Sequence, residues 1–167
     1  MKKILIGTHN KGKFKEISYL ISKKIKKISP EKLKIKSPKE TGKTFSANAK
    51  LKANYFSRFT NLPVISDDSG LCIKALKDKP GIYSARYAKK HGSFYKAMKF
   101  ILRQMKKKKN RSAIFVCSLT YISRKKKKLH QSQEKLRVLL QMKLKEKMVS
   151  GMIQFLFLKI TRKLLDK

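Results

Sequence analysis

At the start of this chain, a pattern of apolar residues typical of a strand is followed by one typical of a helix. Residues 3–7 (KILIG) form a short apolar run, which predicts a buried strand, and a polar turn follows at residues 8–12. The next apolar residues recur at the spacing of one helix face, and they are Phe14, Ile17, Leu20 and Ile21. A strand, a loop and a helix in this order predict the beginning of an α/β unit.

The pattern then predicts a second helix and two further strands. Residues 44–58 predict the helix, because one face of it is apolar, with Phe45, Ala49, Ala53 and Phe56. Residues 63–66 predict a strand that stops at the polar run of residues 67–70 (DDSG), and residues 71–76 predict another strand.

A third helix and a long strand complete this part of the chain. Pro80-Gly81 predicts a turn. The apolar face of the helix that follows is formed by Phe94, Ala97, Met98, Ile101, Leu102 and Met105. Residues 106–110 are a basic break, and residues 113–122 predict the strand.

The character of the sequence changes at residues 125–128 (KKKK). Turn residues nearly vanish beyond this point, and the remainder is rich in Leu, Lys and Met, which predicts a coarse helix with an apolar segment at residues 153–158. We therefore divide the chain into residues 1–128 and an atypical basic tail, residues 129–167.

The net charge of +36 adds an alternative to this picture. A surface of this kind attracts polyphosphates, so a non-enzymatic protein that binds nucleic acid is one alternative. A protein that binds an anionic membrane surface through its basic tail is another. The excess is almost all Lys and is spread along the whole chain, which favours a coding bias towards A-rich codons over specific nucleic-acid recognition.

The hydrophobic runs are too short for membrane insertion. None approaches the roughly 18–20 residues that span a bilayer. The apolar run after Met1-Lys2-Lys3 is also too short for a signal peptide. The sequence predicts a cytoplasmic protein with one domain.

Acidic residues are scarce, and Asp67 and Asp68 are the only adjacent pair among nine. Carboxylate oxygens suit Mg²⁺, which in turn suits phosphates, so this pair is a candidate metal site. The alternative is that the two acids begin a turn, where Asp and Ser are common. The loop of residues 8–13 (THNKGK) lies between a strand and a helix, where backbone N–H groups can hold phosphate; the alternative there is an ordinary turn.

Four motifs occur in a fixed order: THNKGK, ETGKTF with an NA..KA helix, SDDSGL, and PGIYSARYA. Together they resemble the inosine triphosphate pyrophosphatase family, which acts on non-standard purine nucleoside triphosphates, over about residues 1–122. The resemblance implies an α/β fold with a mixed central sheet, flanking helices and a nucleotide cleft between two lobes, in a homodimer. It also implies Mg²⁺-dependent hydrolysis of ITP, dITP and XTP to the monophosphate and pyrophosphate.

The resemblance implies the following site residues. Substrate would be bound by Thr8, His9, Asn10, Lys11, Gly12, Lys13, Lys52 and Ser69. Asp68 would be the catalytic carboxylate and would share the metal with Glu40. Tyr83 and Arg86 belong to the last motif, but neither residue receives a role from it.

The chain departs from the family pattern in two places. Ala47 stands where the family usually has Glu, and the family's later GFGYDP and Ser-His-Arg motifs are missing. If the codons are read one base earlier, Met148-Val149 forces Gly and Met152-Ile153 forces Asp, and the stretch between and around them permits GFGYDPIFIP. We hypothesise that residues 129–167 are the product of a frameshift.

This hypothesis predicts that sequencing the gene through the codons for Lys125 to Lys128 will find a base gained or lost there. A run of Lys codons is rich in A, and such a run is a natural site for a slip. The corrected frame should then encode GFGYDP. If the gene sequence stands as it is, the tail is genuine and the hypothesis is wrong.

Overall fold

A computed structural model describes residues 2–125 and 127–140 of the chain. In this part of the chain the strands are β1 (Lys3–Ile6), β2 (Lys26–Ile28), β3 (Val64–Ile73), β4 (Lys79–Pro80), β5 (Ser112–Ser123) and β6 (Lys128–Leu139). The α-helices are α1 (Lys11–Leu20), α2 (Phe45–Ser57), α3 (Ser84–Lys90) and α4 (Phe94–Gln104), and short 3-10 helices lie at Pro30–Leu33, Lys74–Leu76 and Gly81–Tyr83.

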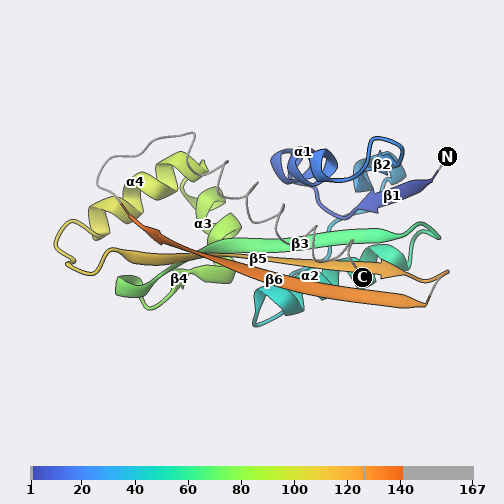
Figure 1. Ribbon diagram of the computed structural model, residues 1–167. Helices are drawn as coiled ribbons and strands as arrows, with labels where there is room; N and C mark the ends of the chain where they lie inside the picture. Colours follow the sequence, from blue (N-terminus) through green and yellow to red (C-terminus); the bar gives the residue numbers. More distant parts are fainter. Residues whose placement is uncertain (1, 126, 141–167) are drawn as a thin grey trace.

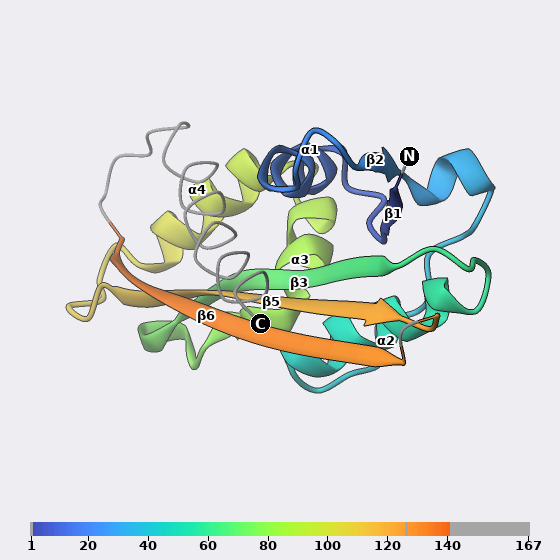
Figure 2. The ribbon, with the colours of Figure 1, turned by 45° about the vertical axis from the view of Figure 1, so that its right-hand side comes forward.

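The strands form one mixed sheet in the order β2-β1-β3-β5-β6, with β4 beside the end of β3. β1 is parallel to β2 and β3, whereas β4, β5 and β6 are antiparallel to their neighbours. Helices α1 and α4 lie on one side of β3 and β5, and α2 lies on the other (Figures 1 and 2). The predicted α/β class, with a mixed central sheet and flanking helices, is confirmed.

Hydrophobic periodicity located two helices and one long strand correctly. The helices predicted at residues 44–58 and 94–105 are α2 and α4, and the strand predicted at residues 113–122 is β5. The apolar residues that carried the α2 prediction are all buried: Phe45, Ala49, Ala53 and Phe56. Burial of these faces against the sheet is the main source of helix stability, because short helices are marginal in isolation.

The strand break predicted at residues 67–70 is wrong. β3 continues without interruption from Val64 to Ile73, and Asp67 and Asp68 pair with Leu119 and Ser118 of β5. Polar side chains suggested a turn, but the antiparallel ladder with β5 keeps the backbone extended. The two acidic residues therefore lie in the middle of a strand.

The helix predicted after residue 128 is also wrong where it can be compared with the structure. Residues Lys128–Leu139 form β6, which pairs along its whole length with β5. The division at residue 128 and the frameshift remain hypotheses, and residues 141–167, with the apolar segment 153–158, lie outside the described residues. None of the described helices is long and apolar enough to cross a membrane.

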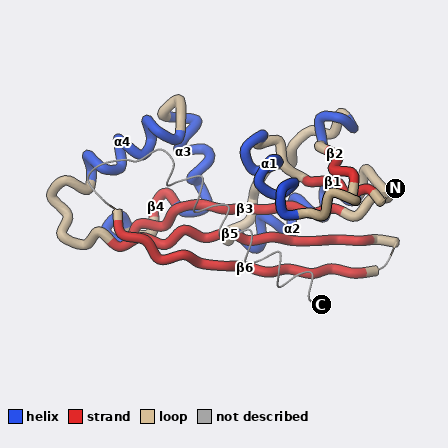
Figure 3. Tube along the Cα trace, turned by 45° about the horizontal axis from the view of Figure 1, so that its top comes forward, coloured by secondary structure: helices blue, strands red, loops and turns tan. Residues whose placement is uncertain are grey.

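One edge of β3 is open beside the candidate site. The edge pairs with β1 at Val64 and Ile65, where the Gly7 N–H donates to the Ile65 carbonyl (2.7 Å), and it pairs with β4 only from Cys72 onward. Within residues 2–125 and 127–140, no strand pairs with the stretch between. Figure 3 shows α3 and α4 over one end of the long strands and α1, β1 and β2 at the other.

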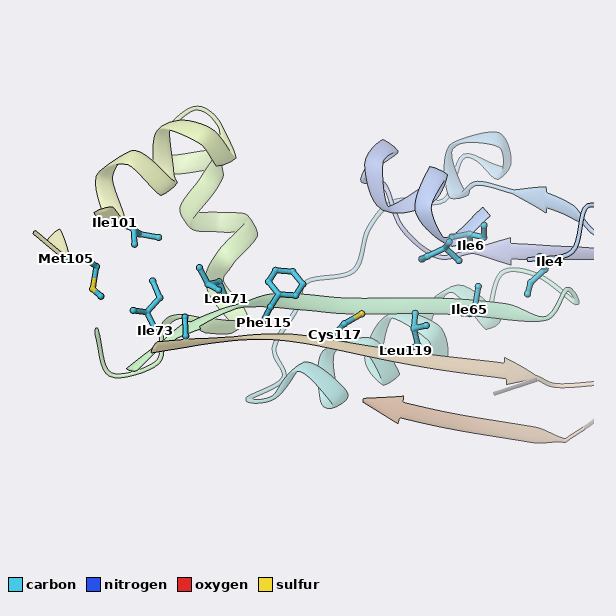
Figure 4. Close-up of a cluster of buried hydrophobic side chains, with 12 residues drawn as sticks. Ile4, Ile6, Ile65, Leu71, Ile73, Ile101, Met105, Phe115, Cys117 and Leu119 are labelled. Carbon is cyan, nitrogen blue, oxygen red and sulfur yellow. The ribbon is translucent and has the colours of Figure 1, made fainter. Parts of the chain in front are cut away.

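Each face of β3 carries its own hydrophobic cluster. Figure 4 shows the larger one, which spreads along β3 and β5 between Ile101 and Met105 at one end and Ile4 and Ile6 at the other. The second cluster contains Leu5, Ile28, Ile35, Phe56 and Val64. Because side chains alternate along a strand, Asp67 shares a face with the first cluster and Asp68 with the second.

A buried ion pair holds α1 against β3. The Lys13 Nζ lies 2.7 Å from Asp67 Oδ2, and the Asp67 side chain is fully buried. Burial is the largest single influence and raises the pKa of Asp67, but the charges of Lys13 and Lys52 and the hydrogen bonds to the carboxylate together outweigh it, so the pKa is lowered. Glu16, one turn along α1, has a raised pKa of about 7, because of burial first and of the Asp67 charge second, and Lys13 offsets this only in part. Its Oε2 has no hydrogen-bond partner among the described residues.

Gly70 allows the start of α3 to approach β3. Ser84 Oγ donates to the Gly81 carbonyl (2.7 Å) and accepts from the Leu71 N–H (3.0 Å). A Cβ on Gly70 would lie 2.6 Å from Ser84 Oγ and would also collide with the Gly81 carbonyl oxygen. The absence of a side chain at Gly70 therefore permits this contact.

We expect Gly70→Ala to destabilise the protein by about 1–3 kcal/mol, because overpacking forces backbone shifts. Urea denaturation would measure the free energy of unfolding. Gly12→Ala is the control, since a Cβ there would meet only Asn10 Oδ1, at 3.2 Å. Equal stability of Gly70→Ala and the unchanged protein would contradict this account of Gly70.

We expect Glu16→Gln to stabilise the protein at pH 8 but not at pH 4. Below the unfolded pKa of 4.5 the carboxyl group is protonated in both states. Between pH 4.5 and about 7 the unfolded state loses its proton and the folded state keeps it, so stability falls as pH rises. The gain at pH 8 should be about 1 kcal/mol after allowance for solvent screening.

Thermal unfolding of both proteins from pH 4 to pH 8 would measure this difference. Glu31→Gln is the control, because the pKa of Glu31 is shifted in the opposite direction from that of Glu16. At Glu31 burial is outweighed by hydrogen bonds from its own backbone and Ser29, and the pKa is lowered. A Glu16→Gln variant with the same pH profile as the unchanged protein would show that Glu16 is not held protonated by its surroundings.

Candidate active site

A buried amide connects Asp68 to the loop that carries Glu40. The Asn48 Nδ2 donates to Asp68 Oδ2 (3.0 Å), and Asn48 Oδ1 accepts from the Gly42 N–H (2.8 Å). Asn48 lies in the first turn of α2 and is fully buried. One side chain therefore sets the position of a carboxylate on β3 and of a loop residue near Glu40.

Glu40 is contacted by two cations from different helices. The Lys52 Nζ of α2 lies 3.0 Å from Glu40 Oε1. From α3, the Arg86 guanidinium donates to the Glu40 carbonyl oxygen (2.7 Å), and its charge lies 3.9 Å from Glu40 Oε2. Glu40 is thus held through both its side chain and its backbone.

The pKa of Asp68 is raised to about 6 by these surroundings. Burial is the largest cause; the charges of Lys52 and Lys13 and the hydrogen bond from Asn48 act in the opposite direction, and the nearby Glu40 carboxylate raises the pKa further. A carboxyl group with such a pKa can exchange a proton close to neutral pH. Asp67 on the other face differs, because its pKa is lowered.

The loop of residues 8–13 has its own internal hydrogen bonds. Asn10 caps α1, since its Oδ1 accepts from the N–H groups of Gly12 (2.9 Å) and Lys13 (3.2 Å). Thr8 is buried, and its Oγ1 accepts from the Asn10 N–H (3.2 Å). The cap thus uses two amides of the helix N-terminus, while the charge of Lys13 acts on Asp68 and lowers its pKa.

The structure also gives the surroundings of three other proposed substrate residues, His9, Lys11 and Ser69. The His9 Nε2 lies 3.0 Å from the Ile35 carbonyl oxygen, and its Nδ1 contacts Ser37 Oγ, so the ring is engaged with the following loop. Lys11 is exposed. Ser69 follows Asp68 on β3 and is 9% exposed.

Asn48 is a site residue that the sequence analysis did not single out. It lies beside Phe45 and Ala49 on the buried face of α2. A polar residue on such a face needs a hydrogen-bond partner, and this requirement is the signal that could have identified it. Ala47 adjoins it, and the first turn of α2 contains no acidic residue.

The acidic residues can offer only part of a metal shell. Among the residues that the structure describes, no group of three or more His, Cys, Asp or Glu could hold a metal ion. Glu40 and Asp68 supply two carboxylates. Mg²⁺ is commonly bound by one or two carboxylates together with phosphate oxygens and water, so this donor set fits Mg²⁺ once a phosphate is present.

Comparison with known proteins finds curated relatives of bacterial origin. The dITP/XTP pyrophosphatase of Leptospira interrogans is 37% identical over 123 residues, which cover 72% of this chain and 62% of the relative. That of Haemophilus influenzae is 42% identical over 124 residues, which cover 72% of this chain and 64% of the relative. The chain thus spans less than two thirds of the length of these relatives.

Solved structures share the fold. A HAM1 protein from Coxiella burnetii matches over the whole of both chains with a TM-score of 0.81 at 23% identity. The Ham1 protein of Staphylococcus aureus matches with a TM-score of 0.72 at 30% identity, over 84% of this chain and 72% of that one. The model of the Ham1 family matches residues 4–144, which include both carboxylates of the candidate site. On this match, which spans most of its length, the chain belongs to the Ham1 family.

Proposed function

We propose that the chain is a pyrophosphatase that hydrolyses non-standard purine nucleoside triphosphates, namely ITP, dITP and XTP, to the monophosphate and pyrophosphate. The name of the relatives, dITP/XTP pyrophosphatase, supports the substrate class. The observation that carries the proposal is Asp68, a buried carboxylate with a pKa of about 6 between the charges of Lys52, Lys13 and Glu40.

Each part of this arrangement has a role in the hydrolysis. The oxygen of a water molecule forms a bond to phosphorus, the anhydride bond between the α- and β-phosphates breaks, and pyrophosphate leaves. Asp68 orients the water and accepts its proton, which a carboxylate with a pKa near 6 can do at neutral pH. Lys13 and Lys52 place positive charge beside the phosphates and stabilise the charge that develops on them.

Mg²⁺ is the cofactor that we propose for this site. Glu40 and Asp68 would hold it, and when bound it would neutralise phosphate charge. In the structure, Lys52 Nζ lies 3.0 Å from Glu40 Oε1 and neutralises that carboxylate. A metal ion bound to Glu40 would take over this role, and Lys52 would then be free to interact with the phosphates. Ala47 brings no carboxylate to the first turn of α2, so of these three positions Glu40 and Asp68 would hold the metal.

The remaining features follow the family resemblance. We propose a homodimer that acts in the cytoplasm, takes no specific nucleic acid as a partner and does not span a membrane. The finding that no described helix could cross a membrane is consistent with the last point. Thr8, His9, Asn10, Lys11, Gly12 and Ser69 stay in the proposed substrate site, with Asn10 acting through its cap of α1.

We expect the protein with a restored reading frame to hydrolyse ITP in the presence of Mg²⁺ and to release IMP and pyrophosphate in equal amounts. Asp68→Asn should lower kcat by about 10³-fold, because loss of a positioned base typically costs 10²–10⁴. Coupled detection of pyrophosphate and chromatography of the nucleotide would measure both products. The chain with residues 129–167 in their present sequence should be assayed in parallel, to measure the effect of this tail on turnover.

Asp78→Asn is the matched control, because Asp78 is an exposed acid whose ion pair among the described residues is with Lys74 at the surface. It should leave kcat unchanged. If neither form of the protein hydrolyses ITP, dITP or XTP, the proposed function fails. If Asp68→Asn keeps full turnover, the enzyme assignment stands but the role of Asp68 is wrong.

A further inference from the structure

Glu40 lies on a segment with no regular secondary structure. Residues 35–44, between the 3-10 helix Pro30–Leu33 and α2, contain neither helix nor strand. Backbone hydrogen bonds of a helix or a ladder therefore do not fix Glu40. Its position has to come from contacts that other elements make with this segment.

Arg86 provides a contact of a different kind from that of Lys52. Lys52 meets the carboxylate at Oε1, whereas Arg86 donates to the backbone carbonyl oxygen of Glu40 at 2.7 Å. A carboxylate held only at its tip can follow movements of its own backbone. The bond from Arg86 removes that freedom, because it fixes the main chain from which the side chain extends.

Arg86 is itself well anchored. Its guanidinium lies 5.0 Å from the centre of the Tyr83 ring, a cation–π arrangement that restricts the side chain. Ser84, between these two residues, ties the start of α3 to the Leu71 N–H of β3 at 3.0 Å. Leu71 is three residues from Asp68 on the same strand, so Arg86 and Asp68 are positioned by the same part of the sheet.

We propose that Arg86 is a positioning residue that sets the distance between the Glu40 and Asp68 carboxylates, with Tyr83 supporting its guanidinium. This inference rests on the proposed function, because it assigns those two carboxylates to one Mg²⁺ ion. It gives a role to the last motif of the sequence, PGIYSARYA. Outer contacts that orient metal ligands typically change metal affinity or activity by about 10–100-fold when removed.

The test compares Arg86→Gln, Arg86→Lys and Arg103→Gln in the full chain with a restored frame. Arg103 on α4 is exposed, and its side chain has no hydrogen bond or ion pair in the described part of the chain, so its variant controls for the loss of one charge. We expect Arg86→Gln to raise the Mg²⁺ concentration for half-maximal activity about tenfold and to lower kcat. KM for ITP at saturating Mg²⁺ should change little.

Hydrogen–deuterium exchange of the protein without nucleotide or metal gives a second readout. Amides in residues 35–44 should exchange faster in Arg86→Gln than in Arg103→Gln, while peptides of β5 stay unchanged. Arg86→Lys keeps the charge and a donor, and we expect it to recover part of the Mg²⁺ dependence. Thermal unfolding should show that all three variants remain folded, since Arg86 is 52% exposed.

Three results would overturn the inference while the proposed function stands. They are unchanged exchange of residues 35–44, unchanged Mg²⁺ dependence, and a rise in KM for ITP alone, which would make Arg86 a substrate contact. Absence of ITP hydrolysis by the unsubstituted protein is a different result. It would remove the proposed function, and with it the metal that Glu40 and Asp68 are inferred to share.

Discussion

Two adjacent carboxylates inside a buried strand are the constraint on which the rest of this structure depends. A charge removed from water is unfavourable by several kcal/mol unless a cation or hydrogen-bond donor compensates it. Asp67 meets Lys13 of α1 on one face of β3, and Asp68 meets Asn48 of α2 on the other. Because each flanking helix supplies a polar partner, the positions of α1 and α2 are fixed by charge as well as by apolar packing.

The partners on the two faces of β3 stabilise the ionised forms of Asp67 and Asp68 to different extents. The two aspartates differ in their proposed roles for this reason. Lys13 contacts Asp67 directly and lowers its pKa, so Asp67 remains ionised and holds α1 in place. Burial raises the pKa of Asp68 to about 6, because the Asn48 amide and the charges of Lys52 and Lys13 offset it only in part, and the Glu40 carboxylate adds negative charge nearby. Two neighbouring aspartates therefore differ in their pKa values, and this difference is the basis for proposing Asp67 as a structural anion and Asp68 as the proton acceptor.

How far the sequence predicted this arrangement depends on the range of the interaction concerned. Apolar periodicity located α2, α4 and β5, because the spacing of apolar residues within each of these elements reveals its buried face. The same approach wrongly predicted a break in β3 at its polar run and a helix in place of β6. Both strands are stabilised by pairing with β5 rather than by the local conformational preference of their residues. Contacts such as that of Arg86 with Glu40, 46 positions apart, leave no spacing signal at all.

Because the chain is strongly basic, selectivity between polyanions has to come from the local geometry around Asp68 rather than from the net charge. A net charge of +36 attracts any polyphosphate, so long-range attraction cannot distinguish a nucleoside triphosphate from other polyanions. Of the nine acidic residues, four lie around one point of β3: Glu16, Glu40, Asp67 and Asp68. Under the function proposed above, discrimination depends on whether the Glu40 segment is held beside Asp68, so the contacts of that irregular segment matter as much as the strand that carries Asp68.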